Sequence, residues 1–207
     1  MKITRLAIVA GLVGAVSTAQ AQEVQFIGSN IGCFYTTVVC TPSGLTTDVV
    51  SDGHATSYTG STFDVTTSDG FVGIGDNAAT PNTNNLGSFS LSNSTYNYTT
   101  NPVYFVLTTS FTAPTSTDAV FLATLKGSVH SNGTGGIIID FNNNPQTFTW
   151  SGGSFDYSVN DVSVNNGKTI ALSGQITTTT VPEPSSMALL GTGLIGLVPM
   201  IRRRKQS

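Results

Sequence analysis

The sequence predicts an all-β body, an antiparallel β-sandwich of jelly-roll-like form, between two short terminal segments of different composition. Three observations lead to this fold class. Thr, Ser, Asn and Gly dominate the body, while 39% of residues are hydrophobic and only 9% are charged, so there is enough apolar material for a core. Apolar residues recur at every second position, and no stretch sustains the 3.6-residue period of a helix. Turn-forming residues separate these stretches at intervals of about 8–12 residues.

The alternation predicts strands along most of residues 22–176, which we assign to the sandwich ectodomain. The pattern is clearest where Phe105, Leu107 and Phe111 recur at odd-numbered positions, because residues two apart in a strand lie on the same face. The predicted strands cover 24–26, 63–65, 87–91, 103–111, 121–129, 137–141, 148–150, 155–159 and 170–176.

Three connecting segments are predicted from their turn residues. Asn166-Gly167, between Val164 and Ile170, is typical of a two-residue β-hairpin turn. Residues 70–85, rich in Gly, Asn, Asp, Thr and Pro, are predicted to form a long surface loop. Four consecutive threonines at 177–180 indicate a linker, residues 177–181, that joins the body to the C-terminal segment.

Residues 1–21 have the three parts of a secretory signal peptide. Lys2 and Arg5 precede an apolar run over 6–16, which predicts a short helix. The small residues of Ala19-Gln20-Ala21 are typical of a cleavage site. Signal peptidase is therefore expected to cut between Ala21 and Gln22.

The C-terminal segment, residues 182–205, has a similar modular order. It begins with Pro182, Glu183 and Pro184 and continues with an apolar stretch over 187–201 that is barely long enough to cross a bilayer as a helix. The stretch is followed by a basic tail, which by the positive-inside rule stays in the cytoplasm while the body lies outside. The tail consists of Arg202, Arg203, Arg204 and Lys205.

This order of Pro-Glu-Pro motif, short apolar span and basic tail resembles the PEP-CTERM sorting signal of Gram-negative bacteria. The resemblance covers roughly residues 181–205. It implies that an exosortase recognises Pro182, Glu183 and Pro184 while the protein is held in the inner membrane with its body in the periplasm. It also implies a final location at the cell surface or outside the cell, where exopolysaccharide is exported.

Cys33 and Cys40 are the only cysteines in the chain. In an exported protein an even number of cysteines favours a disulfide. The bond requires the chain to turn back within residues 34–39.

The charge distribution excludes several function classes. Between residues 22 and 181 only Lys126 and Lys168 are basic, against ten acidic residues, so the body carries 2 − 10 = −8. Such a body does not neutralise phosphates, which argues against nucleic-acid binding.

The residues that catalysis needs are also scarce. Glu23 is the only Glu in this span and the chain has two histidines, and this scarcity argues against the carboxylate pair of a glycosidase and the histidine base of a serine hydrolase. We therefore predict a protein that is not an enzyme and holds no cofactor or metal.

Two interpretations of the body remain open. The first is a structural or adhesive surface protein associated with exopolysaccharide or biofilm, attached weakly at many points without a dedicated pocket. The alternative is a carbohydrate-binding, lectin-like module, with or without calcium. Aromatic candidates for stacking on sugars are Trp150, Tyr96, Tyr98 and Tyr104, with a core role favoured for Trp150. Candidates for calcium are Asp64, Asp69, Asp76 and Asn77, although ordinary turn chemistry explains these residues better.

Overall fold

The computed structural model describes residues 23–75 and 84–180, and within these residues the chain forms fifteen strands and no helix. The strands are β1 (Gln25–Tyr35), β2 (Val49–Ser51), β3 (Thr56–Thr59), β4 (Thr62–Thr66), β5 (Phe71–Ile74), β6 (Ser88–Leu91), β7 (Tyr96–Asn97), β8 (Tyr104–Ala113), β9 (Thr117–Val129), β10 (Gly135–Phe141), β11 (Gln146–Trp150), β12 (Gly153–Val159), β13 (Val162–Asn165), β14 (Thr169–Ala171) and β15 (Gly174–Thr180). The signal helix and the C-terminal membrane helix predicted from the sequence lie outside these residues. Within them, no helix meets the length and hydropathy needed to cross a membrane.

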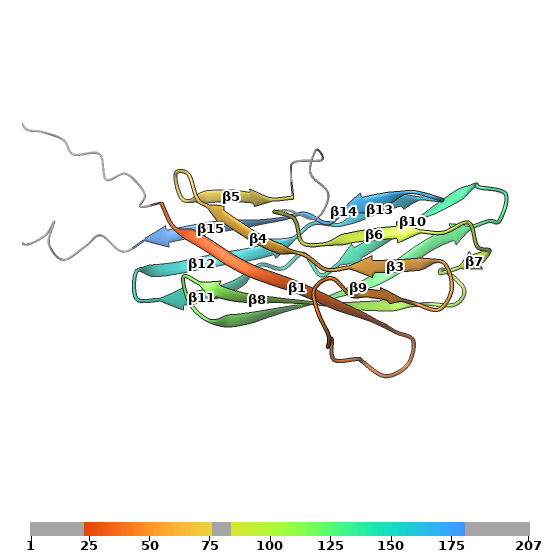
Figure 1. Cartoon of the computed structure of the whole chain (residues 1–207), viewed down its shortest axis with the longest axis horizontal. Coiled ribbons are helices and arrows are strands. Elements are labelled where there is room, and N and C mark those ends of the chain that lie inside the picture. Colours follow the sequence, from red (N-terminus) through yellow and green to blue (C-terminus); the bar gives the residue numbers. More distant parts are fainter. Residues whose placement is uncertain (1–22, 76–83, 181–207) are drawn as a thin grey trace, which may run out of the picture.

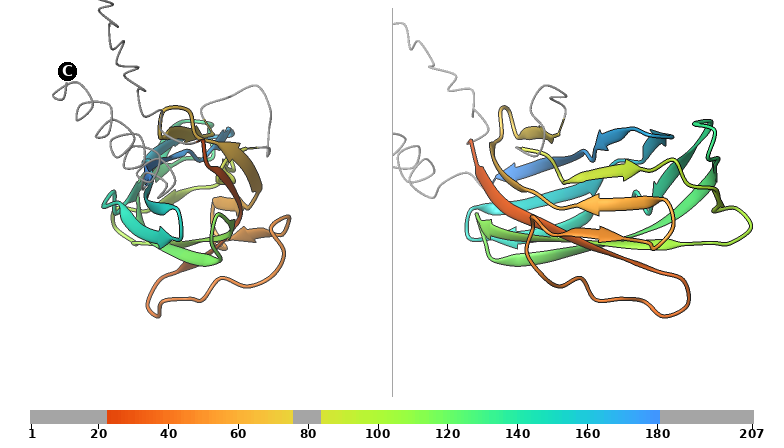
Figure 2. Two further views of the ribbon diagram at one scale, coloured as in Figure 1. Left: turned by 90° about the vertical axis from the view of Figure 1, so that its left-hand side faces the viewer. Right: turned by 45° about the vertical axis from the view of Figure 1, so that its right-hand side comes forward.

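The strands form three antiparallel sheets around one interior. A seven-stranded sheet has the order β13-β10-β9-β8-β1-β4, with β7 added beside β9. Two four-stranded sheets, β11-β12-β15-β5 and β14-β6-β3-β2, lie toward opposite ends of the long axis (Figure 1). Viewed along that axis, the sheets curl around a common centre (Figure 2). The antiparallel, all-β sandwich predicted from the sequence is thus confirmed.

Aromatic side chains fill the interior between the sheets. Phe111 of β8 lies at the centre, with its ring centroid 5.1 Å from that of Tyr157 and 5.3 Å from that of Phe155. Phe26 of β1 packs edge-on to Phe155 at 4.9 Å. These pairs join β1 and β8 of the long sheet to β12 of the opposite sheet, so burial of the rings holds the two layers together.

The period-two pattern of the long strands is confirmed by their burial. Along β8, Phe105, Leu107 and Phe111 are at most 1% exposed, while the alternate residues include Thr108 and Ser110, which are only partly buried. The outward residues of β9 include Val120 and Leu122, which are half exposed. The seven-stranded sheet therefore has a core face and an outer face.

Strand β1 is longer than the sequence pattern indicates, because small and polar residues occupy much of its core face. That face carries Gly28, Asn30 and Gly32 between Phe26 and Phe34. A Cβ atom at Gly32 would lie 2.2 Å from the ring of Phe105. The glycine thus makes room for an aromatic ring from the neighbouring strand.

A buried polar network occupies the same region. Thr109 Oγ1 donates a hydrogen bond of 2.7 Å to Asn30 Oδ1 and lies 3.0 Å from the hydroxyl of Tyr157. All three side chains are fully buried. Since the single proton of Thr109 Oγ1 is directed at Asn30, the Tyr157 hydroxyl donates to Thr109.

The first of three connections that differ from the prediction is the turn at Asn166-Gly167. Asn166-Gly167 does form a tight turn, with the Lys168 N–H donating to the Asn165 carbonyl, but the flanking strands do not form a hairpin: β13 pairs with β10, and β14 pairs with β6. The turn therefore carries the chain from one sheet to another.

The predicted loop at 70–85 contains a strand, and four of the five residues of the predicted linker, 177–180, belong to another strand. Strand β5 covers Phe71–Ile74 and pairs with β15. The threonines at 177–180 belong to β15, which lies between β12 and β5. β-branched threonine suits a strand with neighbours on both sides, so the folded body extends to Thr180 rather than ending at residue 176.

Candidate functional site

The C-terminal segment begins directly after the last strand. Strand β15 ends at Thr180, so Val181 alone separates it from Pro182. Pro182, Glu183, Pro184 and the basic tail, Arg202, Arg203, Arg204 and Lys205, lie outside the described residues, as do Ala21 and Gln22 of the predicted signal cleavage site. Their roles stay predictions from the sequence.

The four aromatic candidates occupy different surroundings. Tyr98 is buried, and its hydroxyl donates to Asp52 Oδ2 at 2.5 Å and lies 2.7 Å from Thr56 Oγ1. Burial, reinforced by the hydrogen bond to Asp52, raises the pKa of Tyr98 well above the usual value for a phenol. This side chain is therefore a structural anchor.

Tyr96 lies near the surface, but another ring covers it. Its centroid is 3.9 Å from that of His54 in a nearly parallel stack, and the edge of Tyr98 contacts it at 4.7 Å. Trp150 is half-buried and packs against the core, 6.0 Å from Phe155. The core role predicted for Trp150 agrees with this packing.

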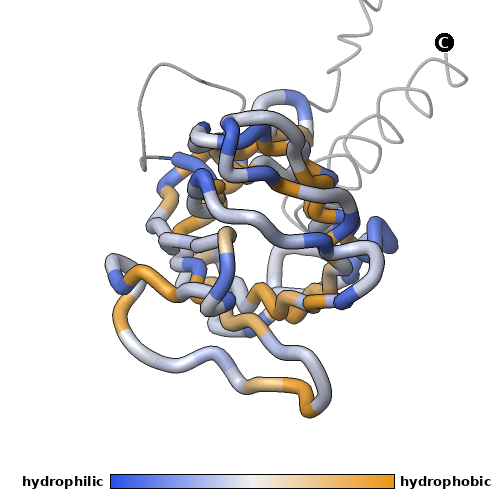
Figure 3. The backbone as a smooth tube through the Cα atoms, turned by 90° about the vertical axis from the view of Figure 1, so that its right-hand side faces the viewer, coloured by the Kyte–Doolittle hydropathy of each residue, from blue (hydrophilic) through white to orange (hydrophobic). Residues whose placement is uncertain are grey.

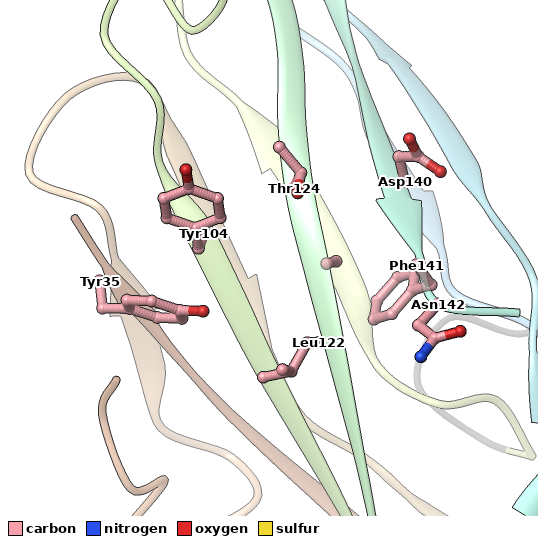
Figure 4. Close-up of a pocket in the computed structure, with 8 residues that line it drawn as sticks. Tyr35, Tyr104, Leu122, Thr124, Asp140, Phe141 and Asn142 are labelled. Atoms are coloured by element: carbon pink, nitrogen blue, oxygen red, sulfur yellow. The ribbon is translucent and has the colours of Figure 1, made fainter. Parts of the chain in front are cut away.

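Tyr104 lies in an open groove on the outer face of the seven-stranded sheet. Its neighbour across the β1–β8 pairing is Tyr35, and the two rings stack with centroids 5.2 Å apart and an interplanar angle of 25°. Together with parts of the backbone, these rings border a cavity of about 410 Å³ (Figure 4). We call this feature the outer groove and define it by Tyr35, Tyr104, Leu122, Thr124, Asp140 and Asn142.

The outer groove crosses four adjacent strands. Tyr35 lies opposite Tyr104, Tyr104 opposite Thr124, and Thr124 opposite Asp140. These four residues therefore form one row on the outer face, aromatic at one side and polar at the other. Leu122, which is 47% exposed, lies two residues before Thr124 and adds apolar surface to the floor.

One charged pair stands at the polar side of the outer groove. Asp140 Oδ2 forms an ion pair with Lys126 Nζ, and both side chains are exposed to solvent. Asn142 lies just beyond, with its backbone N–H donating to the Leu122 carbonyl. The groove thus offers hydroxyl, carboxylate and amide groups opposite the stacked tyrosines.

The predicted disulfide is present beside this groove. Cys33 and Cys40 are bonded, and Cys33 lies opposite Val106 on the outer side of β1. The loop that the bond closes exposes Val38 and Val39. Figure 3 shows apolar stretches along the loop that follows β1. The bond ties the chain that follows Tyr35 back to β1.

Most aspartates of the described body serve local structure. Asp52 accepts hydrogen bonds from the backbone of His54 and Thr56, and Asp161 accepts one from the backbone of Phe141. Asp64, a calcium candidate, accepts from the side chain of Gln25, and Asp69 occupies a turn with a φ of 52°.

The remaining calcium candidates, Asp76 and Asn77, lie outside the described residues. Within residues 23–75 and 84–180, no three acidic, His or Cys side chains gather in a way that would hold a metal ion.

Sequence reasoning identified Tyr104 but missed Tyr35, Thr124, Asp140 and Asn142. No local pattern connects these positions, because they meet only through the pairing of β1, β8, β9 and β10. The nearest signal is the position of Tyr35 two residues after a disulfide cysteine, which places it at the border of a constrained loop.

Comparison with known proteins identifies the C-terminal segment. Residues 180–205 match the family model of the PEP-CTERM protein-sorting motif. No curated protein and no solved structure matches the chain. The chain therefore carries a PEP-CTERM sorting signal, which makes it an exported protein that is anchored in the membrane before an exosortase processes it.

Proposed function

We propose that this protein is a non-enzymatic structural or adhesive component of an extracellular polysaccharide matrix, released to the cell surface or beyond after processing. The observation that carries the proposal is the sorting motif at residues 180–205. A protein sorted by this route is delivered to the side of the envelope where exported polysaccharide accumulates.

The surface chemistry of the body supports the same role. The outer side of β8 presents Thr108, Ser110 and Thr112. Hydroxyl groups both donate and accept hydrogen bonds, as sugar hydroxyls do, so repeated weak contacts with a polysaccharide are favourable. Many such contacts along one polymer strengthen attachment without a deep pocket.

The placement of the carboxylates supports a non-enzymatic role. A glycosidase needs two carboxyl groups on either side of a scissile bond. Here Asp52 and Asp161 hold backbone N–H groups, while Asp156 accepts from the hydroxyl of Thr147 at 2.5 Å. Side chains engaged in this way stabilise turns and strand pairs.

The geometry of the body also places the outer groove away from the end that is anchored in the membrane. Val24 and Thr178 lie at one end of the body, near the turn between β4 and β5. Tyr35 lies ten residues along β1, a distance of about 33 Å in an extended strand. While the tail is still in the membrane, the outer groove is therefore far from the anchored end.

The test combines processing and matrix retention in the producing cells. Changing Pro182, Glu183 and Pro184 together to Ala is expected to leave a full-length form in the inner-membrane fraction, whereas the control variant Gln206→Ala is processed normally. The wild-type protein should co-fractionate with the polysaccharide matrix and leave its chain length unchanged. A wild-type protein that washes freely from the matrix, or that shortens the polysaccharide, would contradict the proposal.

A further inference from the structure

We propose that the outer groove is a binding site for a neutral polysaccharide chain, seated on Tyr35 and Tyr104. The inference rests on the proposed function for the location of the protein. It goes further by assigning the binding to one site and to one class of ligand. The site differs from Trp150, whose packing against the core assigns it to structure.

The first argument is the aromatic platform. Tyr35 and Tyr104 come from neighbouring strands and stack at 5.2 Å, and each ring is only partly buried. Their phenol rings combine an apolar body with a polar hydroxyl, which suits a ligand that has C–H faces edged by hydroxyl groups. Sugar rings are such ligands.

The second argument is the convergence of polar groups opposite the platform. Thr124 follows Tyr104 in the same cross-strand row, and Asp140 follows Thr124. An apolar surface with a few placed polar groups is the usual composition of a small-molecule site. The Thr124 hydroxyl and the Asn142 amide each have donor and acceptor atoms, so a sugar hydroxyl has partners for its hydrogen and for its oxygen.

The third argument is the shape of the outer groove. It spans β1, β8, β9 and β10, which are three strand spacings or about 14 Å across. Because it is open rather than enclosed, it suits an internal segment of a linear chain better than a single terminal sugar. An open site buries little of its ligand, so we expect a dissociation constant of about 1 mM for one short oligosaccharide.

The fourth argument is electrostatic and selects the ligand class. The body carries −8 between residues 22 and 181, and the cation beside the groove, Lys126, is already paired with Asp140. A polyanion such as a uronic-acid chain would meet repulsion from this net charge and find no unpaired cation at the groove. A neutral chain avoids that cost.

The experiment titrates the exported protein, purified from the producing cells, with two neutral probes, cellohexaose and maltohexaose. NMR should show saturable shifts at outer-groove residues with at least one of them. Tyr104→Ala and Tyr35→Ala are each expected to weaken that binding at least tenfold. Tyr96→Ala, which removes a partly buried tyrosine outside the groove, is the matched control and should bind like the wild type. Equal urea midpoints of variants and wild type would show that the fold is retained.

Four results would overturn the inference. The first is an absence of saturable shifts with both probes, and the second is unchanged binding in both groove variants. The third is preferential binding of an oligoguluronate. The fourth is a wild-type protein that binds neither probe but self-associates, with the self-association abolished by Tyr104→Ala. The last result would make the groove a contact between copies of the chain. Matrix retention of a wild-type protein that binds neither probe contradicts only this inference, whereas free release from the matrix contradicts the proposed function.

Discussion

Replacing Thr109 by Val tests whether the buried polar network stabilises the two layers of the body. The substitution keeps the branched shape of the side chain but removes its hydroxyl. Asn30 Oδ1 then loses the donor that lies at 2.7 Å, and the Tyr157 hydroxyl loses the acceptor at 3.0 Å. Both groups are fully buried, so water does not replace the lost partner.

The expected loss follows from these two orphaned groups. A buried donor or acceptor left without a partner costs about 1–3 kcal/mol. Two such groups, partly offset by the favourable burial of the new methyl group, lower the free energy of unfolding by about 2–4 kcal/mol. Urea denaturation of the exported protein, followed by the fluorescence of Trp150, measures this change.

A double-mutant cycle separates the network from simple packing. Tyr157→Phe removes the orphaned hydroxyl, so in the Thr109→Val background it should cost about 1–2 kcal/mol less than it does alone. Thr108→Val, on the outer face of the same strand, is the control and should change stability by less than about 0.5 kcal/mol. Additive effects of the two core substitutions, or equal losses from Thr108→Val and Thr109→Val, would refute the reasoning.

Three further predictions concern the disulfide, the buried phenols and the last strand. Replacing Cys33 and Cys40 by Ser opens a loop of eight residues and should lower the free energy of unfolding by about 2.5 kcal/mol, whereas unchanged urea midpoints would contradict a stabilising role. Burial raises the pKa of the Tyr58 and Tyr157 hydroxyls in the folded protein. As the pH rises above about 10, these hydroxyls therefore lose their protons in the unfolded chain but keep them in the folded protein. Each phenol should then reduce stability by up to about 1.4 kcal/mol per pH unit, which urea midpoints measured between neutral pH and pH 11 would detect, and a flat profile would argue against buried phenols. Deleting residues 177–180 removes four of the seven residues of β15 and should abolish the cooperative urea transition, whereas a chain that ends after Thr180 should keep it.

Local patterns were sufficient to predict the class of fold and the sorting signal of the protein. The alternation of Phe105, Leu107 and Phe111 identifies a half-buried strand because the two faces of a strand are set by its backbone geometry. The Pro-Glu-Pro motif and the disulfide were equally accessible, since each depends on residues close together in the chain.

Contacts with strands that are distant in the sequence account for the misread segments. The core face of β1 carries Gly28, Asn30 and Gly32, which interrupt an apolar alternation, and only the rings of Phe63 and Phe105 explain why small residues are needed there. The threonines at 177–180 have the composition of a linker, yet all four pair with β12 and Thr177 also pairs with β5. In both segments the partner strand, which is distant in sequence, decides the structure.

The sequence by itself determined that this is an exported, sorted, all-β protein with one disulfide, because signal segments, strand periodicity and cysteine count are local properties. Only the tertiary structure decided which strands pair, where the Asn166-Gly167 turn leads, and that Tyr35 stacks on Tyr104 opposite Thr124 and Asp140. The physical reason lies in the register between β1 and β8, two strands that are far apart in the chain. Their hydrogen-bonded register decides which side chains lie next to each other. Burial of the common core selects that register from the many that the local sequence would permit.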